Sequence, residues 1–269
     1  SRRRAGHHAG IILDSSGFEC SFVRGELAVL SHYKAGGIGA GEHPLREYDL
    51  FDHVIYRCVV GSRAYGLEGP ESDHDRRGVY LPPANMHWSL FGVPDQLDNP
   101  DTEEVYWEIQ KFLVLALKAN PNVLECLYTP LVEHASPLAQ EMLAMRDRFL
   151  SKLVYQTYNG YVLSQFKKLQ ADLRNKGAVK WKHVMHLIRL LLAGITVLRE
   201  GHVPVAVGEH REKLLAIKLG QVPFEQADAW RLDLHRHFEQ AYATTRLPER
   251  PDYGSANALL IKARRSVIG

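Results

Sequence analysis

Cysteine is scarce in this chain: Cys20, Cys58 and Cys126 are the only three among 269 residues. An odd number of widely spaced cysteines argues against a disulfide framework and a cysteine-rich zinc site, and it is typical of a reducing compartment. The sequence also lacks an uninterrupted apolar run of the roughly 20 residues that a membrane helix requires. The longest candidate, residues 187–198, contains Arg189, so a buried helix is predicted there. Nothing at the start has the layout of a secretory leader, and we expect a cytoplasmic protein.

Net charge is also low, at +2, but it is unevenly distributed. Residues 1–150 carry 14 Lys/Arg against 21 Asp/Glu, whereas residues 151–269 carry 19 against 10. An acidic half beside a basic half suggests that one binds cations and the other a polyanion. The alternative is that the basic half only has lysine-rich, solvated helices.

Internal repeats and low-complexity tracts are absent as well, and residues 1–50 form an extension with little readable pattern. The apolar and β-branched spacing predicts strands at 54–60, 74–81 and 103–107. Helices are predicted at 109–118, from 121 through 127, and then almost continuously after Pro130: 137–150, 151–175, 179–200, 223–244 and 255–266. Strands early and helices late predict an α+β chain, with one domain at 51–135 and a helical, basic domain at 136–269.

The first informative motif is Gly61-Ser62, at the end of the predicted strand 54–60. Exposed N–H groups at the start of a helical turn can bind a phosphate, glycine lets it approach closely, and the serine hydroxyl adds a donor. About a dozen residues later come Asp73 and Asp75, two apart on a predicted strand, so both carboxylates project from one face. Paired carboxylates repel unless a cation lies between them, and hard oxygen ligands suit Mg²⁺. The combination predicts phosphoryl or nucleotidyl transfer.

The longer strings around this motif resemble a known family. Residues 61–67 (GSRAYGL), 72–83 (SDHDRRGVYLPP) and 118–125 (KANPNVLE) are similar to the YcgL-type predicted nucleotidyltransferases of the DNA polymerase β superfamily. Residues 182–191 (KHVMHLIRLL) and 247–249 (LPE) fit the same family, so the resemblance covers about residues 54–265. This family is also described as RNA-repair-associated, because its members occur beside RNA ligase and polynucleotide kinase.

The resemblance implies a small mixed β-sheet flanked by helices, followed by an all-helical domain. It further implies two Mg²⁺ ions (Mn²⁺ is possible) and an NTP, ATP being the first choice, with in-line attack of an acceptor hydroxyl on the α-phosphate. Asp73 and Asp75 would bridge the metals. A third carboxylate is expected on the next strand: Glu103 by alignment, with Glu104 and Glu108 as competitors because one residue of slip turns a side chain over. The sequence departs from the superfamily at His74, where an apolar residue is usual.

Basic residues near the motif have two interpretations each. Arg63 and Arg77 could hold triphosphate oxygens, or Arg77 could pair with Asp75 or Glu71. In the helical half the predicted acceptor-binding residues are Lys182, His186 and Arg189, which with His183 share one side of a helix. A zinc site at His183 and His186 is disfavoured, because the usual i, i+4 spacing and the glutamate are missing.

The sequence thus predicts a metal-dependent nucleotidyltransferase that acts on an RNA end, with RNA-repair enzymes as partners and no membrane. Two alternatives stay open: nucleotidylation of a protein or small molecule, and a catalytically weak or inactive RNA-binding or regulatory protein. No oligomeric state is predicted.

Overall fold

The computed structural model describes residues 10–13, 19–22, 49–70, 72–90, 92–99, 101–176 and 179–268. The chain divides into two units, of which the larger comprises Leu50–Ala84 and Pro94–Gly269. The smaller comprises Ser1–Asp49 and Asn85–Val93. Within the smaller unit, β1 (Gly10–Leu13) and β2 (Glu19–Phe22) pair as an antiparallel hairpin.

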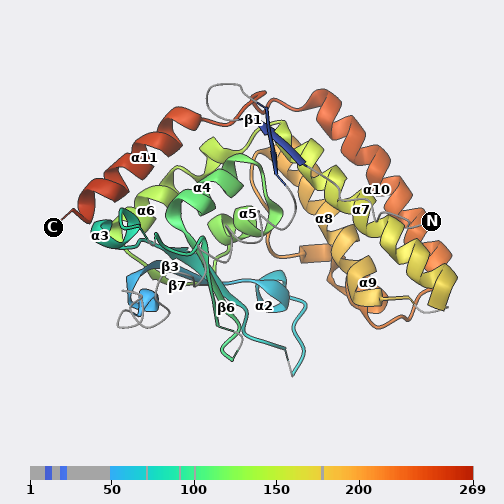
Figure 1. Cartoon of the computed structure of the whole chain (residues 1–269). Coiled ribbons are helices and arrows are strands. Elements are labelled where there is room, and N and C mark those ends of the chain that lie inside the picture. Colours follow the sequence, from blue (N-terminus) through green and yellow to red (C-terminus); the bar gives the residue numbers. More distant parts are fainter. Residues whose placement is uncertain are drawn as a thin grey trace, which may run out of the picture. The chain divides into compact units, whose positions relative to one another are not determined.

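A five-stranded mixed sheet forms the first part of the larger unit (Figure 1). Its order is β5-β6-β4-β3-β7, and β4 and β6 are parallel while the other neighbours are antiparallel. The strands are β3 (Val54–Val59), β4 (Arg76–Tyr80), β5 (Gln96–Asn99), β6 (Glu104–Glu108) and β7 (Val132–Ala135). This sheet with its many helices confirms the α+β prediction.

Helices cover one face of the sheet, and local sequence explains where each begins. They are α4 (Ile109–Leu117), α5 (Pro121–Tyr128) and α6 (Pro137–Ala144). The side chain of Asn120 accepts hydrogen bonds from the first turn of α5, and Ser136 does the same for α6. A proline follows each cap, at the position where a missing N–H does no harm. These short helices therefore have sharply defined starts above the sheet.

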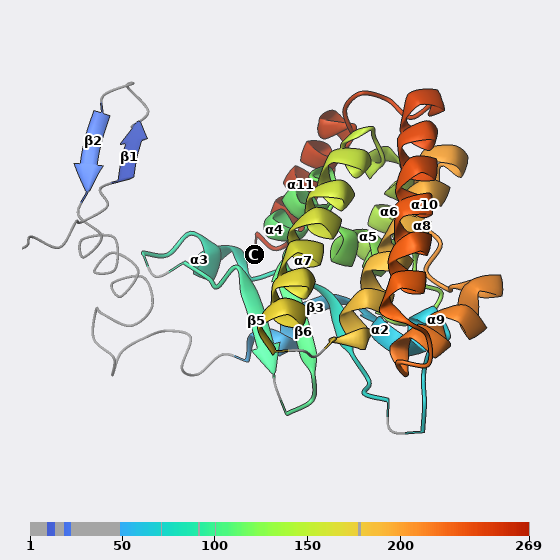
Figure 2. The same ribbon diagram turned by 90° about the vertical axis from the view of Figure 1, so that its right-hand side faces the viewer.

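Longer helices make up the rest of the unit: α7 (Leu153–Lys176), α8 (Trp181–Glu200), α9 (Arg211–Lys218), α10 (Phe224–Thr244) and α11 (Tyr253–Ser266). Helix α8 is central, since α7, α9 and α10 all contact it (Figure 2). By length and composition α8 could cross a membrane, but 67% of its apolar window is buried inside the fold. The prediction of a buried helix at residues 187–198 is confirmed.

The strands and helices differ from the sequence predictions in instructive ways. Strands β5 and β7 were not predicted, because four polar or mixed residues are too few to show a period. Helix α9 was not predicted either. The strand predicted at 74–81 is wrong at its start: β4 begins at Arg76, and Asp73 and Asp75 precede it. Three short 3₁₀ turns, Leu50–His53, Arg146–Phe149 and Gly208–His210, complete the unit.

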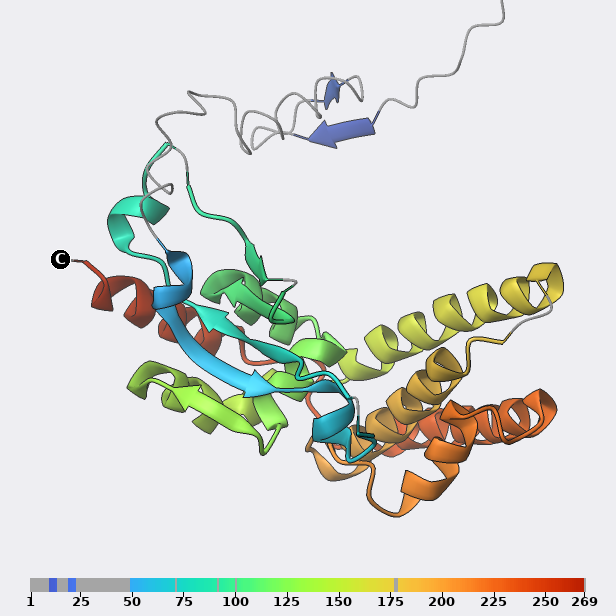
Figure 3. The ribbon, with the colours of Figure 1, turned by 90° about the horizontal axis from the view of Figure 1, so that it is seen from below.

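A short helix, α2 (Gly61–Tyr65), links β3 to the segment that leads into β4. Seen from below, it lies at the end of the blue strand, beside the orange residues around α9 (Figure 3). The backbone there is tied down, because Val207 N–H donates to the Tyr65 carbonyl (3.0 Å) and Arg211 Nε to that of Gly66 (2.8 Å). One continuous hydrophobic core runs from the sheet into the helices. Helix α2 contributes Ala64 and Tyr65 to this core.

Candidate functional site

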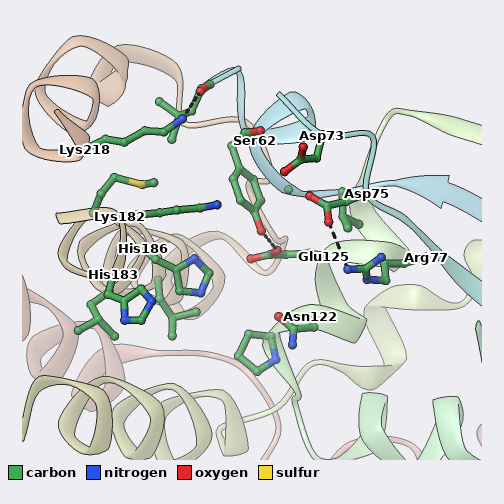
Figure 4. Close-up of a pocket in the computed structure, with 18 of the residues that line it drawn as sticks. Ser62, Asp73, Asp75, Arg77, Asn122, Glu125, Lys182, His183, His186 and Lys218 are labelled. Carbon is green, nitrogen blue, oxygen red and sulfur yellow. Dashed lines mark hydrogen bonds and ion pairs between the residues drawn. The ribbon is translucent and has the colours of Figure 1, made fainter. Parts of the chain in front are cut away.

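A cleft of about 790 Å³ lies between the sheet and helices α5, α7 and α8 (Figure 4). The wall on the sheet side, which we call the acidic wall, contains Gly61, Ser62, Asp73, Asp75 and Arg77. These are the residues that the sequence motif singled out, although they come from α2, the segment before β4, and β4 itself. The fold therefore brings the predicted phosphate-binding turn and the predicted acidic pair into one cavity wall.

Gly61 lies in close contact with the side chain of Asp75, which a larger residue would displace. A β-carbon on Gly61 would lie 2.2 Å from Asp75 Oδ2, and Gly61 has a φ of +71°, in the left-handed region that favours glycine. The backbone joins the same two segments, because Val60 N–H donates to the Asp75 carbonyl at 3.0 Å. The carboxylate of Asp75 is thereby held directly beside the start of α2.

The two arginines near the motif have different surroundings. Arg77 lines the cleft, and its guanidinium lies 3.2 Å from Asp75 Oδ1 and 2.7 Å from the carbonyl oxygens of Arg76 and Glu103. The predicted ion pair with Asp75 is therefore present, and a triphosphate contact by Arg77 stays a prediction. Arg63 is exposed and donates to the backbone carbonyls of Ser72 (2.8 Å) and Asp73 (3.2 Å). Its geometry supports a role in holding the acidic segment in place.

The three candidates for a third carboxylate, Glu103, Glu104 and Glu108, have clearly different surroundings. Glu108 is buried, caps α4 and lies 2.7 Å from Arg264 of α11, so it belongs to the core. Glu104 pairs with Arg76 across the parallel strands (3.7 Å), on the face opposite Asp75 and Arg77. Glu103 directly precedes β6, and its carbonyl accepts from Arg76 N–H at 3.2 Å.

Glu103 is thus next to the acidic segment, but its side chain is exposed and its φ is +54°. The described part of the cleft lining does not include it. Its assignment as third carboxylate stays a prediction.

His74 departs from the superfamily pattern without entering the cleft. Its Nε2 lies 3.3 Å from Glu133 Oε1 on β7, and Glu133 also binds Arg76 Nε at 2.8 Å. His74 therefore interacts with the sheet edge rather than with the space between Asp73 and Asp75.

The opposite wall is built mainly by the first turns of α8. Lys182, His183 and His186 line the cleft there, and Lys218 of α9 joins them. Lys218 Nζ donates to the Leu67 carbonyl (3.0 Å), so this lysine also ties α9 to the segment that follows α2. The predicted acceptor-binding residues Lys182 and His186 thus face the acidic wall across one cavity (Figure 4).

Arg189 is buried, whereas the sequence predicted that it would contact the acceptor. Its side chain is 3% exposed, and its Nη1 lies 2.7 Å from Oε1 of the equally buried Glu125. Its guanidinium carbon stacks 3.6 Å from the centre of the Tyr65 ring, and Tyr65 donates its hydroxyl to Glu125 Oε2 at 2.5 Å. Burial, and next the charge of Glu125, raise the pKa of Tyr65, so this hydroxyl stays protonated. Arg189 is thus part of a buried network that joins α2, α5 and α8, and we assign it no contact with an acceptor.

His186 is affected by this network. Arg189 Nη2 lies 3.4 Å from His186 Nδ1. Burial, and next the positive charge of Arg189, lower the pKa of His186 to about 4. The imidazole is therefore neutral at physiological pH, which does not fit a cationic contact to a phosphate.

Several lining residues were not predicted from the sequence. Asn122 at the start of α5, Tyr161 and Gln165 on α7, and Lys218 on α9 all face the cavity. Asn122 lies inside one of the family-like strings, which was a usable signal. The other three occupy ordinary helical positions, and no local pattern distinguishes them.

The acidic wall fits a Mg²⁺ ion that enters with a nucleotide. Among the described residues there is no group of three His, Cys, Asp or Glu side chains arranged to hold a metal by themselves. Mg²⁺, however, usually takes one or two carboxylates and completes its shell with phosphate oxygens and water. Asp73 and Asp75 supply such a pair in one wall.

Comparison with known proteins identifies one family. Residues 42–262 match the sequence model described as "RNA repair pathway DNA polymerase beta family". The chain is also 27% identical over 154 residues to the uncharacterized protein YcgL of Bacillus subtilis (strain 168). That alignment covers 56% of this chain and 58% of the relative, so it spans little more than half of either protein.

Proposed function

The chain belongs to the RNA repair pathway DNA polymerase beta family, and on that premise we propose that it transfers a nucleoside monophosphate from an NTP to a hydroxyl of an RNA end. The observation that carries the proposal is the acidic wall of the cleft. Ser62, Asp73 and Asp75 line one cavity, and Gly61 lets the Asp75 carboxylate lie against the start of α2. This arrangement supports binding of a metal-bound triphosphate, for which ATP is our first choice.

Each residue of the acidic wall has a definable task in this proposal. Asp73 and Asp75 would hold two Mg²⁺ ions, or Mn²⁺ in their place. The hydroxyl of Ser62 donates to a phosphate oxygen, and Arg77 binds a second one while it orients Asp75. The bound ions supply charge neutralisation on the phosphates and lower the pKa of the attacking hydroxyl.

In the reaction, the acceptor oxygen forms a bond to the α-phosphorus while the bond from that phosphorus to the bridging oxygen of the β-phosphate breaks. Pyrophosphate leaves with the electron pair of the broken bond, and the hydroxyl proton passes to a base. Glu103 is the candidate for that base, because Glu104 lies on the opposite face and Glu108 is held by Arg264.

The opposite wall supports a polyanionic acceptor. Lys182 is exposed at the start of α8 and faces the acidic wall across the cleft, with Lys218 beside it. Two ammonium groups there would bind the backbone phosphates of an RNA end and bring its terminal hydroxyl toward the nucleotide. RNA-repair enzymes such as a ligase or a polynucleotide kinase are the partners that this proposal favours.

The test is incubation of the protein with each α-³²P-labelled NTP, Mg²⁺ and short RNAs that end in a 3′-hydroxyl or a 3′-phosphate. We expect label in RNA that carries the free hydroxyl, none with the 3′-phosphate, and none with the Asp73→Asn, Asp75→Asn double variant. Label that enters protein or a small molecule instead would support the first alternative. Nucleotide and RNA binding without any transfer would support a catalytically inactive RNA-binding protein.

A further inference from the structure

His186 and Arg189 lie almost one turn apart on α8, and their contact determines how His186 faces the cleft. A guanidinium has five N–H groups and no acceptor, so Arg189 Nη2 can only donate. Its partner at 3.4 Å, His186 Nδ1, must therefore be the acceptor and carry no proton. In a neutral imidazole the single proton then resides on Nε2.

The guanidinium of Arg189 is held in one orientation. Its Nη1 is held by Glu125 Oε1 at 2.7 Å, and its guanidinium carbon is 3.6 Å from the centre of the Tyr65 ring. Both members of the ion pair are almost fully buried. Rotation of the guanidinium would leave a buried carboxylate unpaired, which is strongly unfavourable. The group that orients His186 is thus fixed by two neighbouring helices.

The surroundings also keep the ring neutral. The titratable and charged groups that face it are Arg189, Lys182 and His183 from its own helix and Glu125 from α5. Burial and the nearby positive charges outweigh Glu125, and the pKa of His186 falls to about 4. Over the physiological range His186 therefore offers one N–H donor and no charge.

We propose that the Nε2–H of His186 is a neutral hydrogen-bond donor to the nucleoside part of the ligand, and that Arg189 is the positioning residue that fixes this tautomer. The acceptor atom is an oxygen or a ring nitrogen of a base or ribose, not a phosphate. The ligand class rests on the proposed function, whereas the tautomer rests on the geometry alone.

The rest of this wall suits a nucleoside. Tyr161 and Gln165 of α7 and Met185 and Leu190 of α8 line the same cleft as His186. Tyr161 is 40% exposed, and its ring is available for stacking on a base. Gln165 adds an amide that can both donate and accept. Aromatic, apolar and neutral polar groups in one wall are typical of sites that bind bases, while the charged groups Lys182 and Lys218 lie nearer to the phosphates in this proposal.

Two substitutions separate this role from simple packing. His186→Phe keeps a flat ring and removes the donor, whereas His186→Gln keeps an N–H donor without a ring. Equilibrium binding is measured for the four NTPs with Mg²⁺, for a short single-stranded RNA without NTP, and for inorganic tripolyphosphate with Mg²⁺. We expect His186→Phe to weaken binding of NTP or RNA about five- to tenfold, the effect of one lost hydrogen bond, and His186→Gln to restore it to within about twofold.

If His186→Phe weakens NTP binding, the nucleoside that His186 contacts belongs to the NTP. If it weakens RNA binding instead, the nucleoside belongs to the acceptor. Tripolyphosphate binding should be unchanged in both variants. The proposal is overturned if both variants bind every probe as tightly as the parent does, or if both weaken NTP or RNA binding to the same extent. It is also overturned if tripolyphosphate binding is weakened as much as NTP binding.

The tautomer has its own readout, ¹⁵N NMR of the histidine rings at pH 7. We expect His186 with an unprotonated Nδ1 and a protonated Nε2, and a proton on Nδ1 or a cationic ring would overturn the assignment. In the Glu125→Gln, Arg189→Met double variant, which removes both buried charges together, the Nδ1–H tautomer should become populated beside the Nε2–H form. None of these measurements needs nucleotidyl transfer. Failure to label RNA would therefore refute the proposed transfer, whereas the tautomer and the nucleoside contact are decided by the NMR and binding measurements.

Discussion

The carboxylate of Asp75 lies against the backbone of Gly61, so closely that a β-carbon at residue 61 would come within 2.2 Å of Asp75 Oδ2. This contact joins the two parts of the sequence motif, which are 14 positions apart. It explains why a glycine precedes the serine in terms of space as well as backbone conformation.

Gly61→Ala and Gly66→Ala form a matched pair. Both glycines have positive φ, +71° and +70°, but nothing lies within 4 Å of a β-carbon on Gly66. We expect Gly66→Ala to lower the free energy of unfolding by about 1–2 kcal/mol through backbone strain alone. Gly61→Ala should carry the same backbone strain and in addition displace the Asp75 carboxylate, so we expect it to abolish nucleotide transfer while Gly66→Ala does not. Equal stability and equal activity of the two variants in denaturant titration and transfer assays would show that the contact is unimportant.

Asp73→Asn and Asp75→Asn test the acidic pair. Each removes one negative charge at nearly constant volume, and we expect transfer to fall at least ~100-fold as metal affinity is lost. The control is Asp101→Asn, an exposed aspartate in the turn before β6, which should behave like the parent. Near-parental transfer by either cleft variant, measured under saturating Mg²⁺ and NTP, would remove the basis of the enzyme proposal.

Substitutions in the pair Glu125–Arg189 should mainly affect stability. Removing one partner leaves the other charge buried, so Glu125→Gln or Arg189→Met should each lower the free energy of unfolding by about 3–5 kcal/mol. The double variant should lose clearly less than the two effects combined. The exposed pair Arg236–Asp233 on α10 is the control, and Arg236→Ala should change stability by less than about 1 kcal/mol. Additive losses in the double-mutant cycle would mean that the two side chains are not energetically coupled.

His186 predicts a pH dependence of stability. Its pKa is about 4 in the folded chain against an ordinary value of 6.5, so between these values the unfolded state binds a proton that the folded state does not. Stability should be fully present above about pH 6.5 and fall toward pH 4, with a slope of up to about 1.4 kcal/mol per pH unit from this group. His186→Gln should remove that component, whereas His202→Gln, at an exposed site, should not. Unchanged pH profiles of denaturant-induced unfolding in His186→Gln would contradict the neutral-ring assignment.

Lys182 should contribute to RNA binding through its charge. Lys182→Ala is expected to weaken RNA affinity at low salt and to reduce the slope of log K against log salt concentration by about 0.7, the value for one phosphate contact on a single strand. Arg199→Ala is a control on the same helix, because Arg199 is exposed about 25 Å further along α8. A similar loss in both variants would indicate that the basic helices attract RNA without a defined site at the cleft.

Much of the acidic wall was predictable from the sequence. Asp73 and Asp75 share the cleft wall although β4 begins only after them, at Arg76, so the fold and not strand alternation decides their common side. The Gly61-Ser62 turn depends on a short-range rule, because a glycine turn at a strand end is local geometry. The same holds for the caps at Asn120 and Ser136 and for the long helices, whose apolar period is evident without a structure. The four-residue strands β5 and β7 carry too few residues to show a period, and only pairing with β6 and β3 makes them strands.

Other features were decided by tertiary packing, because they join segments that no local pattern connects. Arg189 meets Glu125 64 positions earlier in the chain, and this changes it from an expected acceptor-binding residue to a buried structural one. Cys126 lies beside Cys58 in the core, and the neighbouring thiol together with burial raises its pKa well above the usual range. Tyr161, Gln165 and Lys218 reach the cleft only because α7 and α9 pack against α8. The sequence by itself determined the chemistry of one wall, because that wall is encoded in two short segments. The opposite wall is set by how helices pack around a shared core, and that depends on burial summed over the whole chain.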